Sequence, residues 1–527
     1  MPNLTKDDIQ EVLETIKQLY QEDMIPWICG YSGGKDSTAV LQLVWMALSQ
    51  LPKESLKKTV HVISTDTLVE SPVVALWSSA SLKKMRECAE DAGLPVVPHR
   101  LTPTTSNTFW VNLIGRGYPY PRRDFRWCTD RMKIDPSNRF IKQILDAESE
   151  AILVLGSRKA ESAIRKATME EYEKKRYREH LSPNGSFPNS YVFTPIENWS
   201  NDNVWQFLVQ YENPWGHSNK DLLDMYSGAS ADGECPLVLD TSTPSCGNSR
   251  FGCWVCTMVT EDKSMSAMIQ NDEEKSWMLP MLEFRNRIAG DWETDRKRRD
   301  FRRKDGRLTL YNGNLVHGPY KKEIREVFLR ELLRVEKLVH EIGPEIIQSV
   351  PLITLEELRL IRQIWLEEKH EFDDSLPGIY EDETGIPFDD GGIIKKNKYF
   401  GASEAQILRD ICSEKYEGET LLWSLLCSLL DLEAKAAATS NKRNVILNFE
   451  KEKKRLFIGM KMTQKRLPKT MYVQSLACWI PLMMTSYNGP RDSDQGFEKD
   501  RERGIVTMTM QRSVIPWHEN SIAPNSR

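Results

Sequence analysis

The stretch Tyr31–Ser37 constrains the fold of this chain more than any other. Its sequence, Tyr-Ser-Gly-Gly-Lys-Asp-Ser, follows an apolar segment, Met24–Gly30, that is typical of a short buried strand. After it, Ser37–Leu51 carries apolar residues at helical spacing. The glycine pair therefore stands at a strand-to-helix turn, where the backbone can approach an anion and the helix presents unpaired N–H groups. Because Lys35 adds a mobile positive charge, the pattern predicts a polyphosphate site.

This loop differs from the Walker A loop, in which a glycine and four other residues precede Gly-Lys-Ser/Thr. Only two glycines precede the lysine here, so the loop is not a motif for transfer of a γ-phosphate. A simpler interpretation is an exposed turn with a helix cap from Asp36 or Ser37. The complete pattern after an apolar strand favours nucleotide binding. The loop residues predicted to hold the nucleotide are Ser32, Gly33, Gly34, Lys35, Asp36 and Ser37.

Length and composition limit the class of protein. A chain of 527 residues is too long for one ordinary core, so two or three domains are expected. With 40% hydrophobic and 28% charged residues it is typical of a soluble globular protein, and its net charge of -5 excludes a globally basic nucleic-acid binder. The polar, helix-prone start at residues 7–21 is unlike a secretion signal, and no apolar run approaches the roughly 20 residues that span a bilayer. We expect a cytoplasmic protein with no membrane partner.

Residues 1 to about 200 alternate strand-like and helical patterns. This alternation predicts an α/β fold built on an open, mostly parallel, doubly wound sheet. On such sheets ligands bind beyond the carboxyl ends of the strands, so polar residues should follow each strand. The expected strands are Trp27–Tyr31, Val60–Thr65, Pro95–Arg100, Ala151–Leu155 and Tyr191–Thr194.

Polar side chains do follow the second and fourth of these strands. Asp66 could accept a hydrogen bond from a ribose or lie near the adenine, although a helix cap or turn residue explains it equally well. Gly156 permits a tight turn, and Arg158 and Arg165 are spaced to reach phosphate bidentately. Glu161 could orient an arginine or a metal ion. The simpler interpretation of this segment is a solvated basic helix start; the combination with the glycine loop favours a nucleotide pocket.

Three motifs resemble those of the phosphoadenosine phosphosulfate (PAPS) reductases and their relatives among the ATP pyrophosphatases, the PP-loop or adenine nucleotide alpha-hydrolase family. They are the glycine loop, Gly156-x-Arg158-x-x-Glu161-Ser162 with Arg165, and Thr194–Trp199, and the resemblance covers about 210 residues. In this family the loop grips pyrophosphate while the α-phosphate of ATP is attacked. The resemblance implies catalytic roles for Lys35, Asp36 and Arg158, with Mg²⁺ beside the phosphates.

Ten cysteines in a cytoplasmic chain indicate thiols or metal ligands more than disulfides. Cys253 and Cys256 form a Cys-x-x-Cys turn that can place two sulfurs on one metal centre. By ligand type alone, a zinc site and an iron–sulfur cluster suit such a group about equally, and a redox dithiol is a further alternative.

The same resemblance favours a 4Fe–4S cluster. The iron–sulfur members of the reductase family have a pair of cysteines before a lysine. Cys128 and Lys133 are similar to the second cysteine of that pair and to the lysine, and Trp127 stands where the first cysteine would be. The remaining thiolates must come from elsewhere. The predicted ligands are Cys128, Cys246, Cys253 and Cys256, with Cys235 the alternative to Cys246.

From about residue 261 the pattern becomes helical. Residues 372–392, rich in Asp, Gly and Pro, are expected to form a loop or hairpin insertion. The basic run 296–304 is usually explained as a solvated face, with phosphate-backbone contact the sharper alternative. The predicted domains are a PP-loop ATP pyrophosphatase domain at 1–210, a cysteine-rich iron–sulfur segment at 211–260 and a mainly helical region for partner or DNA contacts at 261–527. Helices are expected at 321–342, 355–368, 405–436 and 448–456.

The whole pattern resembles the DndC family of bacterial DNA phosphorothioation systems. This resemblance implies an ATP pyrophosphatase that activates a DNA backbone phosphate and inserts sulfur into it. The implied partners are DNA, the other phosphorothioation proteins of the same system and a cysteine desulfurase as sulfur donor. Alternatives are a sulfonucleotide reductase, a tRNA thiolation enzyme and a non-catalytic nucleotide-binding assembly module.

Overall fold

This computed structural model describes residues 4–122, 125–229, 251–303, 309–392 and 402–415, with a few positions between 423 and 432. Residue contacts divide the chain into two units, Met1–Met460 and Lys461–Arg527, and every described residue belongs to the first unit.

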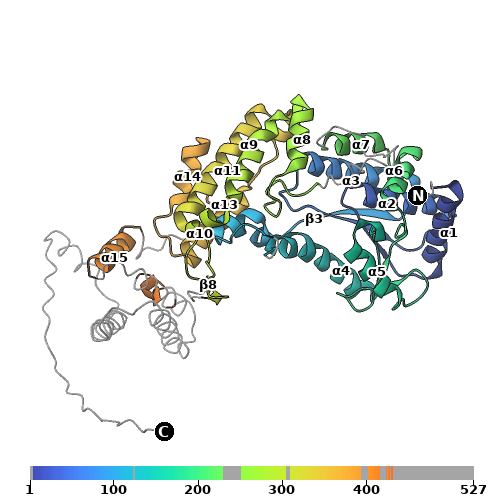
Figure 1. The fold of residues 1–527 in the computed structure, drawn as a ribbon, viewed down its shortest axis with the longest axis horizontal. Coiled ribbons are helices and arrows are strands. Elements are labelled where there is room, and N and C mark those ends of the chain that lie inside the picture. Colours follow the sequence, from blue (N-terminus) through green and yellow to red (C-terminus); the bar gives the residue numbers. More distant parts are fainter. Residues whose placement is uncertain are drawn as a thin grey trace, which may run out of the picture. The chain divides into compact units, whose positions relative to one another are not determined.

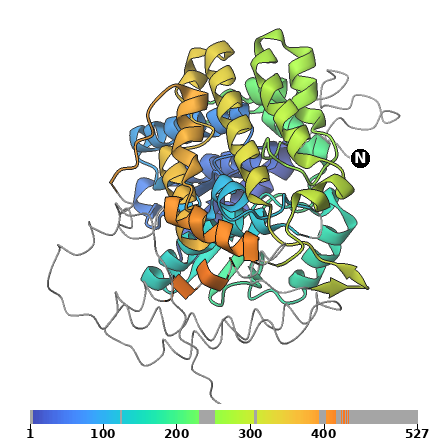
Figure 2. The ribbon, with the colours of Figure 1, turned by 90° about the vertical axis from the view of Figure 1, so that its left-hand side faces the viewer.

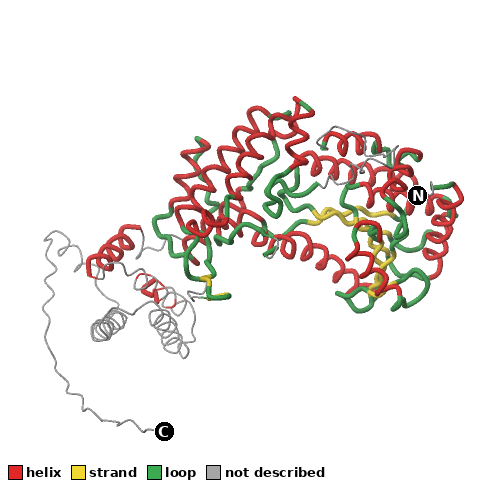
Figure 3. The backbone as a smooth tube through the Cα atoms, in the orientation of Figure 1, coloured by secondary structure: helices red, strands yellow, loops and turns green. Residues whose placement is uncertain are grey.

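Residues 4–229 are built around a six-stranded sheet in the order β3-β2-β1-β4-β6-β5 (Figures 1 and 3). Its strands are β1 (Trp27–Gly30), β2 (Val60–Thr65), β3 (Val96–Leu101), β4 (Ala151–Val154), β5 (Ser182–Pro183) and β6 (Ser190–Phe193). All neighbouring strands are parallel except the two-residue edge strand β5. The predicted mostly parallel sheet is confirmed, and the five predicted strands agree with the observed bounds to within one residue.

Helices cover both faces of this sheet because its central strands are apolar on both sides. Cys29 of β1 pairs between Val62 of β2 and Val154 of β4, and all three side chains face one core. That core is completed by α1 (Lys6–Glu22), α2 (Lys35–Ser49), α3 (Pro72–Ala92) and α6 (Asn201–Gln210). Ile28 and Leu153 face the other side, where α4 (Asp135–Glu148) covers them. The sheet is thus doubly wound.

A second hydrophobic core joins the segment 109–120 to later helices. Trp110 donates a 2.7 Å hydrogen bond to the carbonyl of Leu352, and Trp365 donates a 3.0 Å bond to the carbonyl of Ile114. The helices of this layer are α8 (Lys263–Asn271), α9 (Leu279–Ala289), α11 (Lys322–Ile342), α13 (Leu355–Gln363) and α14 (Ser375–Thr384), and Figure 2 shows several of them side by side. This core therefore draws on the connection after β3 and, through Val69, on the chain after β2.

The remaining elements are short or peripheral. They include α5 (Ala163–Glu173), α7 (Asn219–Gly228), α10 (Trp292–Arg298), α12 (Glu345–Gln348), α15 (Ala402–Lys415), the hairpin β7 (Leu310–Tyr311) and β8 (Asn314–Leu315), and a π-helical segment (Thr129–Ile134). No helix among the described residues has the length and apolar character needed to cross a membrane.

The expectation of a loop or hairpin at 372–392 was wrong, because helix α14 occupies its middle. Leu376 and Ile379, three residues apart, are buried in the second core. Pro377 falls in the first helical turn, where the missing N–H has no intrahelical partner to lose, and Gly385 ends the helix with φ +75°. The predicted helix at 448–456 and most of that at 405–436 lie outside the described residues.

Candidate nucleotide and thiol site

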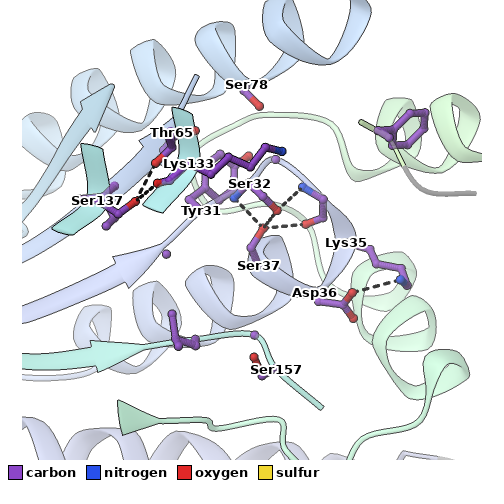
Figure 4. A pocket seen from close by; sticks show the side chains of 18 of the residues that line it. Tyr31, Ser32, Lys35, Asp36, Ser37, Thr65, Ser78, Lys133, Ser137 and Ser157 are labelled. Carbon is purple, nitrogen blue, oxygen red and sulfur yellow. Dashed lines mark hydrogen bonds and ion pairs between the residues drawn. The ribbon is translucent and has the colours of Figure 1, made fainter. Parts of the chain in front are cut away.

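A cavity of about 980 Å³ opens at the carboxyl ends of β1, β2 and β4 (Figure 4). This is the place where open α/β sheets bind ligands. The structure brings every residue predicted to hold the nucleotide to the lining of this cavity. They are Ser32, Gly33, Gly34, Lys35, Asp36, Ser37, Asp66, Gly156, Arg158, Glu161 and Arg165.

The phosphate loop, Ser32–Ser37, is closed by its own side chains. Ser37 Oγ accepts a 3.2 Å hydrogen bond from the amide of Ser32 and donates a 3.0 Å bond to the carbonyl of Gly34. Gly33 has φ +73°, a backbone conformation that residues with a side chain rarely adopt. Gly34 then caps α2, so the positive end of that helix faces the cavity.

Two cations and one carboxylate meet at the first turn of α2. Lys35 Nζ lies 3.1 Å from one carboxylate oxygen of Asp36, and Arg158 Nε lies 2.7 Å from the other. Both cations are largely buried, and Arg158 also donates a 3.3 Å bond to the carbonyl of Trp199. Asp36 thus positions both side chains beside the phosphate loop.

The loop after β4 is pressed against the start of α2. A Cβ atom added at Gly156 would lie 2.9 Å from the carbonyl carbon and oxygen of Asp36, so only glycine fits without a backbone shift. Glu161 accepts a 3.0 Å bond from the amide of Arg158 and forms a 2.6 Å ion pair with Arg165. Arg165 therefore stands at the rim of the cavity, held by Glu161.

Asp66 follows β2 as predicted. One of its carboxylate oxygens pairs with Arg100 at the end of β3, and the other accepts a 2.7 Å bond from the amide of Leu68. It thus fixes the turn after β2 while lining the cavity.

Several residues that line the cavity were not predicted. Tyr226 of α7 accepts a 3.4 Å hydrogen bond from the amide of Lys35, and the Lys35 ammonium lies 5.7 Å from the centre of its ring. Burial raises the pKa of Tyr226 to about 12, so it stays a neutral phenol at physiological pH. Phe251 packs edge-on against the same ring, 4.8 Å between centroids. The helical spacing of apolar residues in the sequence indicates that α7 is amphipathic, but it does not indicate that α7 lies beside the cavity.

The cysteine turn, Phe251–Cys256, is attached to the chain that leaves β2. The amide of Ser71 donates a 3.2 Å bond to the carbonyl of Gly252, and the amide of Trp254 donates a 3.0 Å bond to that of Val69. These bonds place Cys253 beside Glu70, which pairs at 3.3 Å with Lys133. Glu70 and Lys133 both line the cavity, and Cys253 Sγ lies 3.9 Å from a carboxylate oxygen of Glu70.

Cys128 lies close to Cys256, the last residue of this turn. Burial, and secondarily the neighbouring Cys256, raises the pKa of Cys128. Burial, and then the charge of Glu70, raises the pKa of Cys253 to about 12. Without a metal ion or another cation bound to them, the thiols of Cys128 and Cys253 are protonated at neutral pH.

The donor set for a cluster is visible only in part. Cys128, Cys253 and Cys256 lie in the described residues, whereas Cys235 and Cys246 lie outside them. Within the described ranges, no three His, Cys, Asp or Glu side chains are grouped closely enough to hold a metal ion. By ligand type, thiols suit a soft metal centre; as placed here, Cys128, Cys253 and Cys256 are not close enough to share a single metal ion, and a cluster would need a further ligand from elsewhere in the chain.

Residues 26–258 match the family model of the phosphoadenosine phosphosulfate reductase domain. A protein of Methanocaldococcus jannaschii described as uncharacterized is 26% identical over 200 residues, which are 38% of this chain and 35% of that protein. The chain therefore aligns with about a third of the length of this relative. The matched segment contains the phosphate loop, the Arg158 segment and the cysteine turn, so the chain carries a PAPS reductase-like domain.

Two solved structures illustrate the range of similar proteins. Phosphoadenylyl-sulfate reductase from Candida auris is similar over 40% of this chain and 88% of its own, at 13% identity and a TM-score of 0.23. The U34-tRNA thiolase NcsA from Methanococcus maripaludis, solved with its 4Fe–4S cluster, is similar over 54% of this chain and 80% of its own, at 12% identity and a TM-score of 0.26.

Proposed function

We propose that this PAPS reductase-like protein is an ATP pyrophosphatase and sulfurtransferase that converts a DNA backbone phosphate into a phosphorothioate. One observation carries the proposal: the cysteine turn is hydrogen-bonded to the chain leaving β2, so Cys253 lies beside Glu70, which lines the nucleotide cavity and pairs with Lys133. A cysteine group on the opposite side of the sheet would have been unable to serve chemistry at an ATP phosphate.

The phosphate loop supplies the pyrophosphatase half of this reaction. Its glycines and the N-terminus of α2 would hold the β- and γ-phosphates, and Lys35 would offset their charge. Arg158, oriented by Asp36, would stabilise the charge that develops on the α-phosphate. Asp36, the carboxylate of the loop, would hold Mg²⁺, which when bound would offset the charge of the phosphates.

Adenylation explains why ATP is needed. A non-bridging oxygen of the DNA phosphate would attack the α-phosphorus of ATP, forming a new P–O bond as the bond to pyrophosphate breaks. A sulfide-level sulfur would then attack the DNA phosphorus and form a P–S bond, with AMP leaving and carrying the former DNA oxygen. Sulfur delivered as a persulfide would in addition require two electrons from a thiol pair, which would become a disulfide. Unmodified, that oxygen is a poor leaving group, so the step that consumes ATP makes the substitution feasible.

The thiols would hold a 4Fe–4S cluster through Cys128, Cys253 and Cys256, with Cys246 or Cys235 as the fourth ligand. When bound, such a cluster would carry the sulfur supplied by a cysteine desulfurase. Glu70 and Lys133 would form the wall between the thiols and the nucleotide and keep bulk water from the region between them.

A test in cells follows directly. The chain would be expressed with its neighbouring genes, and nuclease digests of DNA would be searched by mass spectrometry for phosphorothioate dinucleotides. We expect them with the wild type and with the controls Lys57→Ala and Cys88→Ala, and not with Lys35→Ala or Cys256→Ala. Lys57 is an exposed lysine. Cys88 lies away from the cysteine turn, and its thiol contacts the carbonyl of Trp215.

Other outcomes would identify other functions. Sulfur in tRNA nucleosides and none in DNA would indicate tRNA thiolation. Thioredoxin-dependent release of sulfite from PAPS would indicate a sulfonucleotide reductase. If Lys35→Ala and Cys253→Ala both kept full DNA modification, the protein would be a nucleotide-binding assembly module and the proposal would be wrong.

A further inference from the structure

We propose that Trp77 and Tyr226 are positioning residues that tie the phosphate loop to the cysteine turn, so that occupancy of the loop is transmitted to Cys253. This inference rests on the proposed function, because it takes the phosphate loop to be the site that binds pyrophosphate. The two residues belong to two separate chains of contacts, one through α3 and one through α7.

The first link runs along the start of α3. Ser71, which precedes this helix, is hydrogen-bonded to Gly252 of the cysteine turn. Less than two turns later, the indole N–H of Trp77 donates a 3.1 Å bond to the carbonyl of Gly33. A single stretch of rigid backbone therefore contacts the cysteine turn at one end and the phosphate loop at the other.

The Trp77 ring and its neighbour have little freedom to move. Its ring packs against that of His217 with 3.7 Å between centroids. Ser78 is equally close to the loop, because a Cβ atom added at Gly33 would lie 2.3 Å from Ser78 Oγ. Gly33 has φ +73° and lies against Trp77 and Ser78 of α3. A change of the Gly33 backbone on binding an anion must therefore be accommodated by α3.

The second link runs through Tyr226. Its hydroxyl accepts the hydrogen bond from the amide of Lys35, and its ring packs edge-on against Phe251 at the start of the cysteine turn. Trp205 packs against the same ring, 5.1 Å between centroids, and fixes it from a further side. Phe251 and the phosphate loop therefore share one buried aromatic ring.

Because two links reach the same turn, the coupling between the phosphate loop and the cysteine turn can be measured from either end. Pyrophosphate that orders the phosphate loop should also order the cysteine turn, and by linkage the state of the turn should alter affinity at the loop. For the proposed reaction this would hold the thiol group in place when ATP is bound.

Hydrogen–deuterium exchange offers two reporter amides for this coupling. The amides of Ser71 and Trp254 make the bonds that join the chain after β2 to the cysteine turn. In the full-length protein, we expect Mg²⁺-pyrophosphate to slow their exchange by about fivefold or more, together with that of the phosphate loop. Amides of α11 in the second core serve as the internal reference.

Conservative variants test the two positioning residues. Trp77→Phe keeps a ring against His217 and loses the N–H, and Tyr226→Phe keeps the ring against Phe251 and loses the hydroxyl. In the double variant we expect pyrophosphate to slow exchange at the phosphate loop and no longer at Ser71 and Trp254. Tyr191→Phe, which loses a 2.8 Å bond to Glu150 on the far edge of the sheet, should behave as the wild type.

The possible results separate this inference from the proposed function. If calorimetry shows no binding of pyrophosphate or of a non-hydrolysable ATP analogue, the proposed function fails and the inference falls with it. If pyrophosphate binds and the reporter amides do not respond in the wild type, only the coupling is overturned. An equal response in the double variant would overturn the roles of Trp77 and Tyr226.

Discussion

Arg158 and Asp36, which are 122 positions apart in the chain, form a 2.7 Å ion pair that joins the loop after β4 to the first turn of α2. Through its second oxygen the same carboxylate holds Lys35. The pair therefore sets the position of both cations that face the phosphate loop. A guanidinium is suited to this place because it donates to Asp36 and to the carbonyl of Trp199 at once.

Replacing Arg158 by lysine should impair ATP cleavage more than folding. A lysine keeps the charge but cannot make both bonds, so the cation would be displaced from the α-phosphate. We expect kcat/KM for pyrophosphate release to fall about 100-fold. Arg176→Lys is the matched control, because Arg176 pairs with Glu197 away from the cavity lining. Equal activity of the wild type and Arg158→Lys would contradict the role given to this arginine.

Gly156→Ala should disturb the same junction through sterics alone. The added methyl group would meet the backbone of Asp36 at 2.9 Å, and backbone atoms cannot turn aside as a flexible side chain can. We expect a loss of about 1–3 kcal/mol in the free energy of unfolding and weaker ATP binding. Gly228→Ala is the control: no atom lies within 4 Å of its added Cβ, and at the end of α7 the change should be neutral or slightly stabilising. Unfolding in urea would measure both.

The sheet and the phosphate loop could be predicted because their signals are local. The central strands β1 and β4 are apolar runs, and the glycine pair marks the turn into α2. The edge strand β5 could not be predicted, because two residues that include Pro183 carry no strand pattern. Helix α14 was missed because Pro377 and Gly378 suggest a loop, whereas burial of Leu376 and Ile379 decides for a helix.

The site was predictable to the extent that its residues stand in motifs. Tyr226 and Glu70 carry no motif; they belong to the site because α7 and the chain after β2 converge there in space. The attachment of the cysteine turn to residues 69–71 is a non-local β-bridge, which no pattern within either segment indicates. The fold thus supplies the relation between thiols and nucleotide that the motifs alone leave open.

The paired histidines of β2 and β3 predict a pH dependence of stability. His61 Nδ1 lies 3.0 Å from His99 Nε2, and burial, followed by the charge of His61, lowers the pKa of His99 to about 4. Its unfolded value is near 6.5, so between pH 6.5 and 4 the unfolded chain binds more protons. The contribution of His99 to the free energy of unfolding is therefore complete above pH 6.5 and is lost as the pH falls toward 4.

We expect this histidine to account for about 1 kcal/mol of the unfolding free energy lost between pH 7 and pH 5, after allowing for its partial exposure. In His99→Gln this loss should shrink by that amount, since glutamine does not titrate. His180→Gln, which replaces an exposed histidine, should keep the wild-type difference. Chemical denaturation at pH 7 and pH 5 measures each difference in the free energy of unfolding. The same difference in His99→Gln as in the wild type would contradict the role given to His99.

Arg285 of α9 should be necessary for the shape of the chain after Cys256. Its guanidinium is fully buried and donates to the carbonyls of Cys256, Val259 and Thr260. Arg285→Met would remove the charged donor that these three carbonyls share, at a cost of about 1–3 kcal/mol in the free energy of unfolding. Arg287→Met on the same helix removes only partly exposed ion pairs with Glu283 and Glu331 and should cost less than about 1 kcal/mol. Hydrogen exchange at residues 256–260 distinguishes local from global effects. Under conditions where both variants are fully folded, we expect faster exchange of these amides in Arg285→Met. Unchanged exchange would show that other contacts hold this segment.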